Sequence, residues 1–395
     1  MRVLVTDGNE RAALAITRAL GREQVEVIVG AESPRSLAGS SRYCRHSFVY
    51  PSPYQAPEQF TTALIAAARQ HKADALFPVS DIAMHIVGPE KSRFEAHLHI
   101  PVPSAKVFEG ISDKYQLMRQ AVEAGVPIPR TIFVPDGRLD GLSEQITEFP
   151  VVVKPGCSLV KEQGRWTKTA VCYANSRAEL EYIYRTQPHL RRPSLIQRRI
   201  IGEGQGLFVL MREGKPLGIF AHRRLRERPP SGGVSVLRES IALPKDMVEA
   251  TLKLLQPVRW DGVAMVEFKV EQSSRRPMLM EINGRFWGSL QLAVDAGVNF
   301  PLLLLNMAMG KAVTIPENGY RIGVQSRWLL GDLDQLLMRL TRRESALHLP
   351  PGAPSRLQAV LSFCRFFGQD LFYEVEQADD PGPSKFEILR YFKLA

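Results

Sequence analysis

Cysteine is scarce in this sequence, and the few cysteines that occur are scattered. Four are found among 395 residues, none in a CxxC or Cys/His arrangement: Cys44, Cys157, Cys172 and Cys364. A disulfide framework or a structural zinc site needs paired spacing of this kind. The sequence therefore argues against both kinds of site, and we expect reduced thiols and a cytoplasmic protein.

Long apolar runs and a glycine-rich first turn are also lacking. No stretch reaches the roughly 18 apolar residues that a membrane span needs, and the opening residues, MRVLVTDGNER, contain no signal-peptide core. The turn at residues 7–11 has one glycine, whereas a dinucleotide-binding fingerprint has three. We therefore expect no membrane span, and no nicotinamide or flavin site in this turn.

A catalytic nucleophile is a third absence, because no convincing Ser/His/Asp or Cys/His arrangement occurs. What the chain has instead is an excess of positive charge, with 51 Lys and Arg against 41 Asp and Glu, a net charge of +10. This balance suits anionic partners such as nucleotides, nucleic acids or membrane surfaces, without choosing among them. The hydrophobic content of 45% is ordinary for a globular chain of about two to three domains.

The first 105 residues alternate strand-like and helix-like segments. Apolar strands are predicted at 2–6, 25–30 and 74–80, with helical spacing between them at 10–20 and 58–70. This alternation is typical of a parallel sheet with helices on its faces. Residues 106–130 then read as a helical connector, with Ser112 or Asp113 as its N-cap.

Beyond residue 150 the pattern changes to short β segments that favour antiparallel pairing. The turn at 212–215, with the sequence REGK, is a hairpin signal. The β segments are predicted at 151–155, 170–174, 194–202, 206–225, 262–270 and 277–283. Two helical stretches flank Gly297, residues 345–357 look like a linker, and 358–373 read as one apolar helix or a strand pair. The predicted class is therefore α/β followed by α+β.

Three oxygen-bearing side chains interrupt two apolar strands near the end of this β region. Glu267 lies in MVEFKV, and Glu281 and Asn283 lie in PMLMEIN. If the two strands are neighbours, these side chains converge, and a divalent cation would relieve the repulsion between the carboxylates. An internal salt-bridge cluster, in which Lys269 and Arg285 pair with the glutamates, explains the spacing equally well.

Several cations stand where an anion would stabilise them. Lys154 ends the apolar strand FPVVVKP and Lys114 opens the connector helix, so together they could clamp phosphate oxygens. Each alone could also be an ordinary strand-end or surface lysine. Residues 221–240 carry a run of arginines that leads into a Gly-rich loop, where guanidinium groups could reach an anion. A solvated face is the alternative there, and an RNA-binding patch is disfavoured because 221–240 contains no aromatic residue.

Four short segments together resemble the ATP-grasp superfamily, in particular its carbamoyl-phosphate-synthase-like and carboxylate–amine ligase branch. They are VVVKP at 151–155, LIQRRIIGE at 195–203, VEF around Glu267 and MEINGR at 280–285. The resemblance covers roughly residues 1–310. It implies an N-terminal α/β pre-ATP-grasp domain at 1–105, connector helices with a small ATP-grasp lobe at 106–190, a large lobe at 191–318 and a C-terminal extension at 319–395.

The resemblance also implies a role for each candidate residue. Lys114 and Lys154 would contact the nucleotide, Glu203 or Gln205 the ribose, and the hinge residues Gln197, Arg198, Arg199 and Ile200 the adenine. Glu267, Glu281 and Asn283 would carry one or two Mg²⁺ ions, with Mn²⁺ as a possible substitute. Arg285, with an arginine from Arg223, Arg224 and Arg226, would stabilise the transferred phosphoryl group and the acyl phosphate.

The sequence departs from the family pattern at two places. The hinge often reads Gln-Glu, whereas here it is Gln197-Arg198. The loop at 156–169 holds only Gly156 and Gly164, fewer glycines than a phosphate-covering loop usually has, and it could be an exposed hairpin.

The implied function is an ADP-forming ligase that activates a carboxylate as an acyl phosphate for attack by an amine. Its expected partners are ATP, Mg²⁺, a small carboxylic acid and a small amine, with no nucleic acid and with a homodimer as a further possibility. The alternatives are a non-catalytic ATP-binding sensor or scaffold and a basic nucleic-acid-binding protein.

Overall fold

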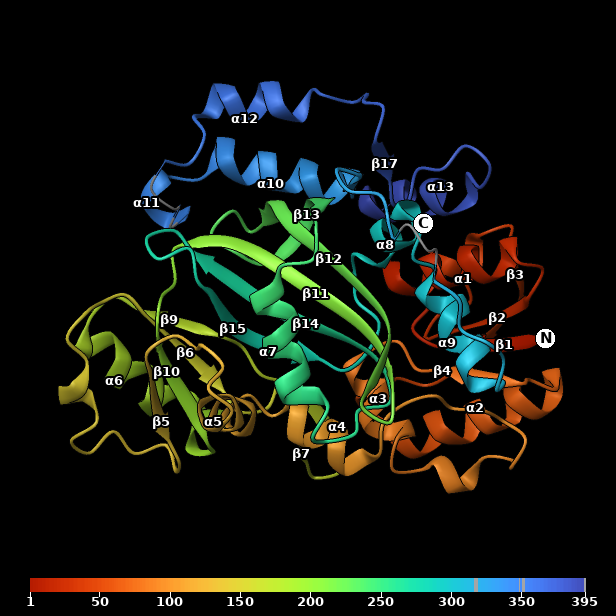
Figure 1. The fold of residues 1–395 in the computed structure, drawn as a ribbon, viewed down its shortest axis with the longest axis horizontal. Helices are drawn as coiled ribbons and strands as arrows, with labels where there is room; N and C mark the ends of the chain where they lie inside the picture. Colours follow the sequence, from red (N-terminus) through yellow and green to blue (C-terminus); the bar gives the residue numbers. More distant parts are fainter. Residues whose placement is uncertain (316–318, 348, 350–351, 394–395) are drawn as a thin grey trace.

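A computed structural model describes residues 1–315, 319–347, 349 and 352–393 of the chain (Figure 1). An N-terminal α/β unit lies at one end, a small β lobe at the other, and a large twisted sheet between them. The helices α10 (Leu329–Thr341) and α12 (Arg356–Phe363) lie near β13 (Val234–Ser240) of the large sheet, whereas α13 (Gly382–Tyr391) lies on the side of the N-terminal unit. This arrangement matches the predicted class of α/β followed by α+β.

The N-terminal unit is a parallel sheet in the order β3-β2-β1-β4. Its elements are β1 (Arg2–Val5), α1 (Arg11–Arg22), β2 (Glu26–Ala31), β3 (Cys44–Val49), α2 (Pro57–His71), β4 (Ala75–Phe77) and α3 (Asp81–Val87). The prediction of a βαβ arrangement is confirmed. Apart from Arg2 and Glu26 at their first positions, β1, β2 and β4 are buried and apolar, as expected for a parallel sheet covered on both faces.

Two connector helices lead to the small lobe, α4 (Ala105–Ser112) and α5 (Lys114–Glu123). Asp113 is the N-cap of α5, because its Oδ1 accepts hydrogen bonds from the backbone N–H groups of Tyr115 at 2.8 Å and Gln116 at 3.1 Å. One of the two predicted N-caps is thus confirmed. The cap fixes Lys114 at the first position of the helix, where its backbone N–H donates to the Gly156 carbonyl at 2.7 Å.

The small lobe is an antiparallel sheet in the order β5-β10-β6-β9. Its elements are β5 (Thr131–Val134), β6 (Val151–Pro155), β9 (Cys172–Ala174), α6 (Arg177–Thr186) and β10 (Ser194–Arg198). A separate hairpin, β7 (Leu159–Glu162) and β8 (Arg165–Lys168), leaves this lobe after β6. The prediction of a hairpin is confirmed, but one side of it is not exposed: Leu159 is buried against the N-terminal unit, and the Trp166 backbone N–H donates to the Tyr54 carbonyl at 2.9 Å.

The large sheet of the described residues has the order β15-β14-β11-β12-β13-β16-β17. Its first five strands in chain order are β11 (Gly202–Arg212), β12 (Lys215–Arg228), β13 (Val234–Ser240), β14 (Gly262–Glu271) and β15 (Pro277–Asn283). The predicted β11–β12 hairpin is confirmed, and its turn residues Glu213 and Gly214 both have positive φ, 48° and 79°. The helices α7 (Lys245–Leu255), α8 (Leu290–Ala296) and α9 (Phe300–Ala308) complete this lobe, with Gly297 as the left-handed C-cap of α8.

The C-terminal segment adds the last two strands to the large sheet. Its elements are β16 (Gln325–Arg327), α10 (Leu329–Thr341), α11 (Glu344–Leu347), α12 (Arg356–Phe363), β17 (Leu371–Tyr373) and α13 (Gly382–Tyr391). The prediction of one apolar helix or a strand pair over 358–373 is wrong. Instead, α12 ends at Phe363, and β17 pairs in parallel with β16. Leu357 and Leu361 of α12 are exposed, so the apolar residues of this segment do not form one buried helix face. The predicted linker at 345–357 lies partly outside the described residues, and its ends belong to α11 and α12.

Arg18 fastens the C-terminal segment to the N-terminal unit. Its side chain is fully buried and donates to Asp380 Oδ2 at 2.8 Å and to the carbonyls of Glu374 and Val375 at 2.7 and 2.9 Å. Within the described residues no single helix is long and apolar enough to cross a membrane; only α8 and α9 together would be, and they are bent by 92°.

Candidate functional site

Two carboxylates face each other on neighbouring strands of the large sheet. In the antiparallel pairing of β14 and β15, Glu267 lies directly opposite Glu281, so both side chains point to the same face. Asn283, two residues further along β15, donates from Nδ2 to Glu281 Oε1 at 3.1 Å. The structure thus brings together the three residues that are predicted to hold a metal ion.

Cations from two other elements compensate the carboxylates. Like charges directly opposite each other destabilise a sheet when nothing compensates them. Lys114, at the start of α5, places its Nζ 3.2 Å from Glu281 Oε2. Arg224, on β12, forms an ion pair with Glu267. Each glutamate therefore has its own cationic partner, from a different part of the fold.

The two carboxylates differ in how readily they ionise. Burial raises the pKa of Glu267 to about 7, with Arg224 opposing and Glu281 adding to the effect. Lys114 holds the pKa of Glu281 well below its usual range, against the effect of burial. A divalent cation between the two groups would let both ionise, because it replaces their repulsion by attraction.

The oxygen atoms present fit a hard divalent cation. Two carboxylates and one amide oxygen on a single face are ligands that Mg²⁺ accepts, and this ion usually keeps phosphate oxygens and waters as its other ligands. No group of three or more His, Cys, Asp or Glu side chains is placed to hold a metal anywhere in the described ranges. The candidate metal site therefore depends on a ligand set with only two acids.

Two lysines lie beside the carboxylates. Lys114 is buried and donates from Nζ to Ser158 Oγ at 2.6 Å; burial opposes its charge, but Glu281 and other nearby acids raise its pKa above the usual value. Lys154, near the end of β6, forms no ion pair within the described part of the chain. Burial lowers the pKa of Lys154 to about 8, although Glu281 opposes this effect. Lys154 is therefore a lysine that an added anion would stabilise.

Arg224 reaches Glu267 by crossing β11, the strand that lies between β12 and β14. Two glycines of β11 leave room for this crossing. A Cβ atom at Gly204 would lie 3.0 Å from Arg224 Cδ, and a Cβ atom at Gly206 would lie 3.0 Å from His222 Nε2. Larger side chains would therefore push against these groups, so the two glycines keep the path to Glu267 open.

Comparison with solved structures shows which fold this is. Biotin carboxylase from Campylobacter jejuni is similar with a TM-score of 0.63 and 16% identity, over 82% of this chain and 74% of that chain. N5-carboxyaminoimidazole synthetase from Staphylococcus aureus has a TM-score of 0.60 and 13% identity, over 82% and 80%. L-amino acid ligase from Bacillus licheniformis has a TM-score of 0.58 and 15% identity, over 78% and 74%. No curated protein matches the sequence.

A family model described as "ATP-grasp in the biosynthetic pathway with Ter operon" matches residues 209–327. The chain has the ATP-grasp fold. The predicted resemblance to the ATP-grasp superfamily is thereby confirmed. The matched residues include β14 and β15 with the opposed glutamates, so the family model and the geometry point to the same part of the chain.

The segment predicted to form the hinge runs from the end of β10 to the start of β11. Gln197 is buried; its Nε2 donates to Thr131 Oγ1 at 2.9 Å, and its Oε1 has no hydrogen-bond partner among the described residues. The Arg198 side chain pairs with Glu271, which is the consequence of the departure from a Gln-Glu hinge. The other two predicted hinge residues are Arg199 and Ile200. The Arg199 guanidinium lies 5.9 Å from the centroid of the Tyr173 ring, and Ile200 is buried. Their contacts with adenine stay a prediction.

Three predicted site residues lie on the opposite face of the large sheet from the carboxylates. Gly206 pairs with Glu267, so the neighbouring side chains of Glu203 and Gln205 point to the other face. Arg223 pairs with Gln205 and shares that face. The structure does not bring these residues to the cluster, and their predicted contacts with ribose and phosphoryl group stay predictions.

Arg226 is also engaged elsewhere. It donates from Nε to Asp332 Oδ1 at 2.7 Å and from Nη1 to Ser362 Oγ at 2.7 Å, which fastens β12 to α10 and α12. Of the three predicted arginines on β12, Arg224 is therefore the one that the structure brings to the carboxylate pair.

Arg285 connects this cluster to the N-terminal unit. Its Nη2 donates to Asp81 Oδ2 at 2.8 Å and to Asn283 Oδ1 at 3.3 Å. The predicted pairing of the glutamates with Lys269 and Arg285 is wrong, because Arg285 pairs with Asp81 and Lys269 lies 3.5 Å from the Ile200 carbonyl. The glutamates form ion pairs with Arg224 and Lys114 instead. Asp81 is not among the predicted site residues. Its position just after an apolar parallel strand is the signal that could have identified it.

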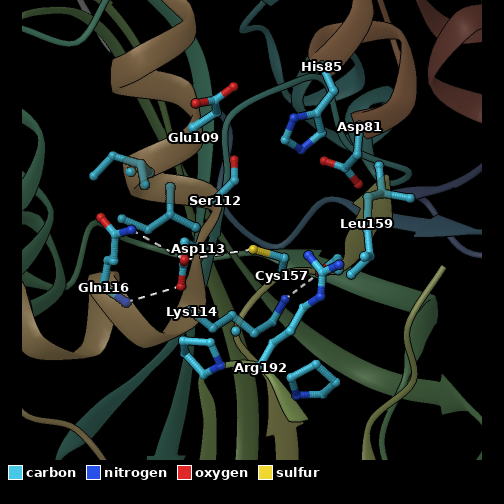
Figure 2. Close-up of a pocket in the computed structure, with 18 of the residues that line it drawn as sticks. Asp81, His85, Glu109, Ser112, Asp113, Lys114, Gln116, Cys157, Leu159 and Arg192 are labelled. Atoms are coloured by element: carbon cyan, nitrogen blue, oxygen red, sulfur yellow. Dashed lines mark hydrogen bonds between the residues drawn. The ribbon is translucent and has the colours of Figure 1, made fainter. Parts of the chain in front are cut away.

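A cavity of about 990 Å³ adjoins the cluster on the side of α4 and α5 (Figure 2). Asp81, Lys114, Arg192 and Asn283 line it, whereas Glu267, Glu281, Lys154 and the hinge do not. Figure 2 shows Asp113, at the start of α5, reaching toward the Cys157 thiol. Burial raises the pKa of Cys157 to about 11, so this thiol is not an activated nucleophile.

Proposed function

We propose that this protein is an ATP-dependent, ADP-forming ligase that activates a carboxylate as an acyl phosphate for attack by an amine. The observation that carries the proposal is the opposed pair Glu267–Glu281 with Asn283 beside it. Arg224 and Lys114 each compensate one of these carboxylates, but burial still raises the pKa of Glu267 to about 7, and a divalent cation between the two groups would relieve this cost. Two solved structures of similar fold support the proposal: the C. jejuni biotin carboxylase is a β-γ-ATP complex, and the biotin carboxylase domain of Hydrogenobacter thermophilus 2-oxoglutarate carboxylase is a complex with MgADP and bicarbonate.

The metal and the phosphates would be held by residues from four elements, β14, β15, α5 and β6. Glu267, Glu281 and Asn283 would hold Mg²⁺ or Mn²⁺. When bound with ATP, this cation would neutralise the charge on the transferring phosphoryl group. Lys114 and Lys154 lie beside this position and would bind phosphate oxygens. Binding of a phosphate also compensates the buried Lys154, which no carboxylate in the described residues pairs with.

Two arginines frame the same face of the sheet. Arg224 holds Glu267, and Arg285 joins Asn283 to Asp81, so each orients one predicted metal ligand. A carboxylate is a poor electrophile because its leaving group would be oxide, and phosphorylation provides a better one. Phosphoryl transfer needs positioning and charge stabilisation rather than a side-chain nucleophile. This requirement agrees with the absence of a nucleophilic triad from the sequence.

Release of ADP tests the proposal. The full chain is incubated with ATP, Mg²⁺ and pooled carboxylic acids and amines, and condensed products are sought by mass spectrometry. Wild-type protein is expected to form ADP, phosphate and a new amide, and Glu281→Gln is expected to lose at least about a hundredfold in rate, because one metal ligand is neutralised. Glu213→Gln, which replaces an exposed acid in the β11–β12 turn, is the matched control.

Two other functions make different predictions. A sensor or scaffold would bind ATP without turnover across the whole panel. A nucleic-acid-binding protein would retain nucleic acid in a salt-dependent manner, and this retention would survive Glu281→Gln. The homodimer stays a prediction, which light scattering would test.

A further inference from the structure

A second cavity lies at the carboxyl ends of the N-terminal parallel strands, next to Arg285. Its volume is about 700 Å³. Its walls are the turns that follow β1, β2 and β4, the docked β7–β8 hairpin, and Arg285. The crevice outside the carboxyl ends of parallel strands is where open α/β sheets bind ligands. No step of the proposed phosphoryl transfer uses this cavity, so its occupant is still to be assigned.

Asp7 is a partly buried acid in the wall of this cavity. Its Oδ2 accepts a hydrogen bond from the Thr6 hydroxyl at 2.5 Å and another from the Ser80 backbone N–H at 3.0 Å. No lysine or arginine pairs with it among the described residues. Burial raises the pKa of Asp7, and the neighbouring Glu10 acts in the same direction. A cation inside the cavity would relieve both effects.

The other charges of the cavity leave an excess of unpaired acid. Glu10 and Glu32 are exposed at its rim and have no ion-pair partner within the described ranges. On the basic side, Arg285 is already paired with Asp81, the Lys168 ammonium lies 5.2 Å from the centroid of the Tyr54 ring, and Arg390 of α13 also lines the cavity. Asp7, Glu10 and Glu32 thus face two cations, Lys168 and Arg390. The lining therefore favours a small organic cation over an anion.

The cavity is linked to the proposed phosphoryl-transfer site through Asp81 and Arg285, which line it. Ser80, whose backbone holds Asp7, is followed directly by Asp81, and Asp81 pairs with Arg285. Arg285 in turn donates to Asn283 beside the carboxylate pair. A ligand in the cavity would therefore lie next to an acyl phosphate formed at that pair.

We propose that this cavity binds the amine substrate as its ammonium form, with Asp7 as the ionic partner. The inference rests on the proposed ligase function and assigns one of its two substrates to a class, primary amines. Asp7 would accept a proton from the bound ammonium to give the neutral amine. The amine nitrogen then forms a bond to the acyl carbon, the bond between that carbon and the phosphate oxygen breaks, and phosphate leaves with the electron pair and takes the second amine proton as hydrogen phosphate.

Binding of a simple diamine tests the site without any nucleotide. Ligand-observed NMR would measure the affinity of the full-length chain for 1,4-diaminobutane and for its neutral counterpart, 1,4-butanediol. The diamine is expected to bind wild-type protein at least about tenfold more tightly than the diol, because the diol cannot form the charged contact. Asp7→Asn is expected to weaken diamine binding at least about tenfold, and Glu249→Gln, an exposed acid on α7, is expected to leave it unchanged.

Asn is the suitable replacement because Asp7 has a φ of 59°, in the left-handed region that Asn also tolerates. If Asp7→Asn does not fold, Glu10→Gln at the exposed rim replaces it, with an expected loss of about two- to fivefold. Equal binding of the diamine to wild type and to the variant tested, or equal binding of diamine and diol, would overturn the inference while leaving the ligase proposal untouched. Conversely, Glu281→Gln is expected to lose ADP release and keep its diamine affinity, so the two proposals fail separately.

Discussion

If Lys154 binds the nucleotide phosphates as proposed, its lowered pKa makes nucleotide binding dependent on pH in a predictable direction. Burial brings the pKa of this lysine from its usual 10.5 to about 8. Below pH 8 the side chain carries its charge and can bind phosphate oxygens. Above pH 8 the free protein loses this charge, so nucleotide binding must be accompanied by proton uptake. Affinity is therefore complete at low pH and lost as the pH rises through 8.

The magnitude follows from the size of the shift. With one proton taken up on binding, the dissociation constant rises by about tenfold for each pH unit above 8. The effect ends when the pH reaches the pKa that Lys154 has in the complex. If bound phosphate returns this pKa to about 10.5, the total loss of nucleotide affinity is about 300-fold. The pKa of Glu267, about 7, lies below this range, and its titration does not obscure the slope.

Calorimetric titration with ADP in the absence of divalent cations, from pH 7.5 to 9.5, would measure this dependence. Lys154→Arg is the matched variant, because an arginine keeps its charge over the whole range and should remove most of the slope. Lys269, whose pKa burial also lowers, would account for any slope that remains in this variant. A wild-type affinity that does not change above pH 8, or an identical slope in Lys154→Arg, would refute the assignment of Lys154 to the phosphates.

Three further changes have defined outcomes. Gly204→Val should displace the Arg224 side chain and lower ATP-dependent turnover about tenfold or more with little change in melting temperature, whereas retained turnover would show that the crossing over β11 is dispensable. Arg18→Ala should reduce the free energy of unfolding by about 3–5 kcal/mol in denaturant titrations, because it leaves a buried carboxylate unpaired. The control Arg22→Ala, at an exposed position on α1, should reduce it by less than about 1 kcal/mol. Similar losses in the two variants would contradict the burial argument. Glu281→Ala should abolish ATP-dependent activity with an unchanged circular dichroism spectrum, and wild-type turnover would disprove the metal assignment.

The N-terminal sheet could be predicted because its central strands are buried on both faces and therefore read as continuous apolar runs. β3 could not be recognised in the same way. It is an edge strand with the sequence CRHSFV, and its side chains are mostly exposed, so no apolar pattern marks it. β16 and β17 are three residues each, too short for any periodicity to develop.

The candidate site was predictable where charges interrupt an apolar pattern, as at Glu267 and Glu281. The arginines of β12 could not be separated by sequence, because alternation alone does not fix which residues share a face when the register shifts near Arg224. Asp7 and Asp81 each lie in a short segment with other polar residues after a strand, which is common in loops. Their importance appears only when the fold places both beside Arg285.

The anchoring of Arg18 has a consequence for how the protein is made. The guanidinium and its acceptor at Asp380 are 362 positions apart in the chain. The first α/β unit therefore emerges from the ribosome with a cation whose buried position has no partner until residues 374–380 have been synthesised. A contact of such long range makes loop closure costly and slow. The packing around Arg18 should consequently be completed late in folding.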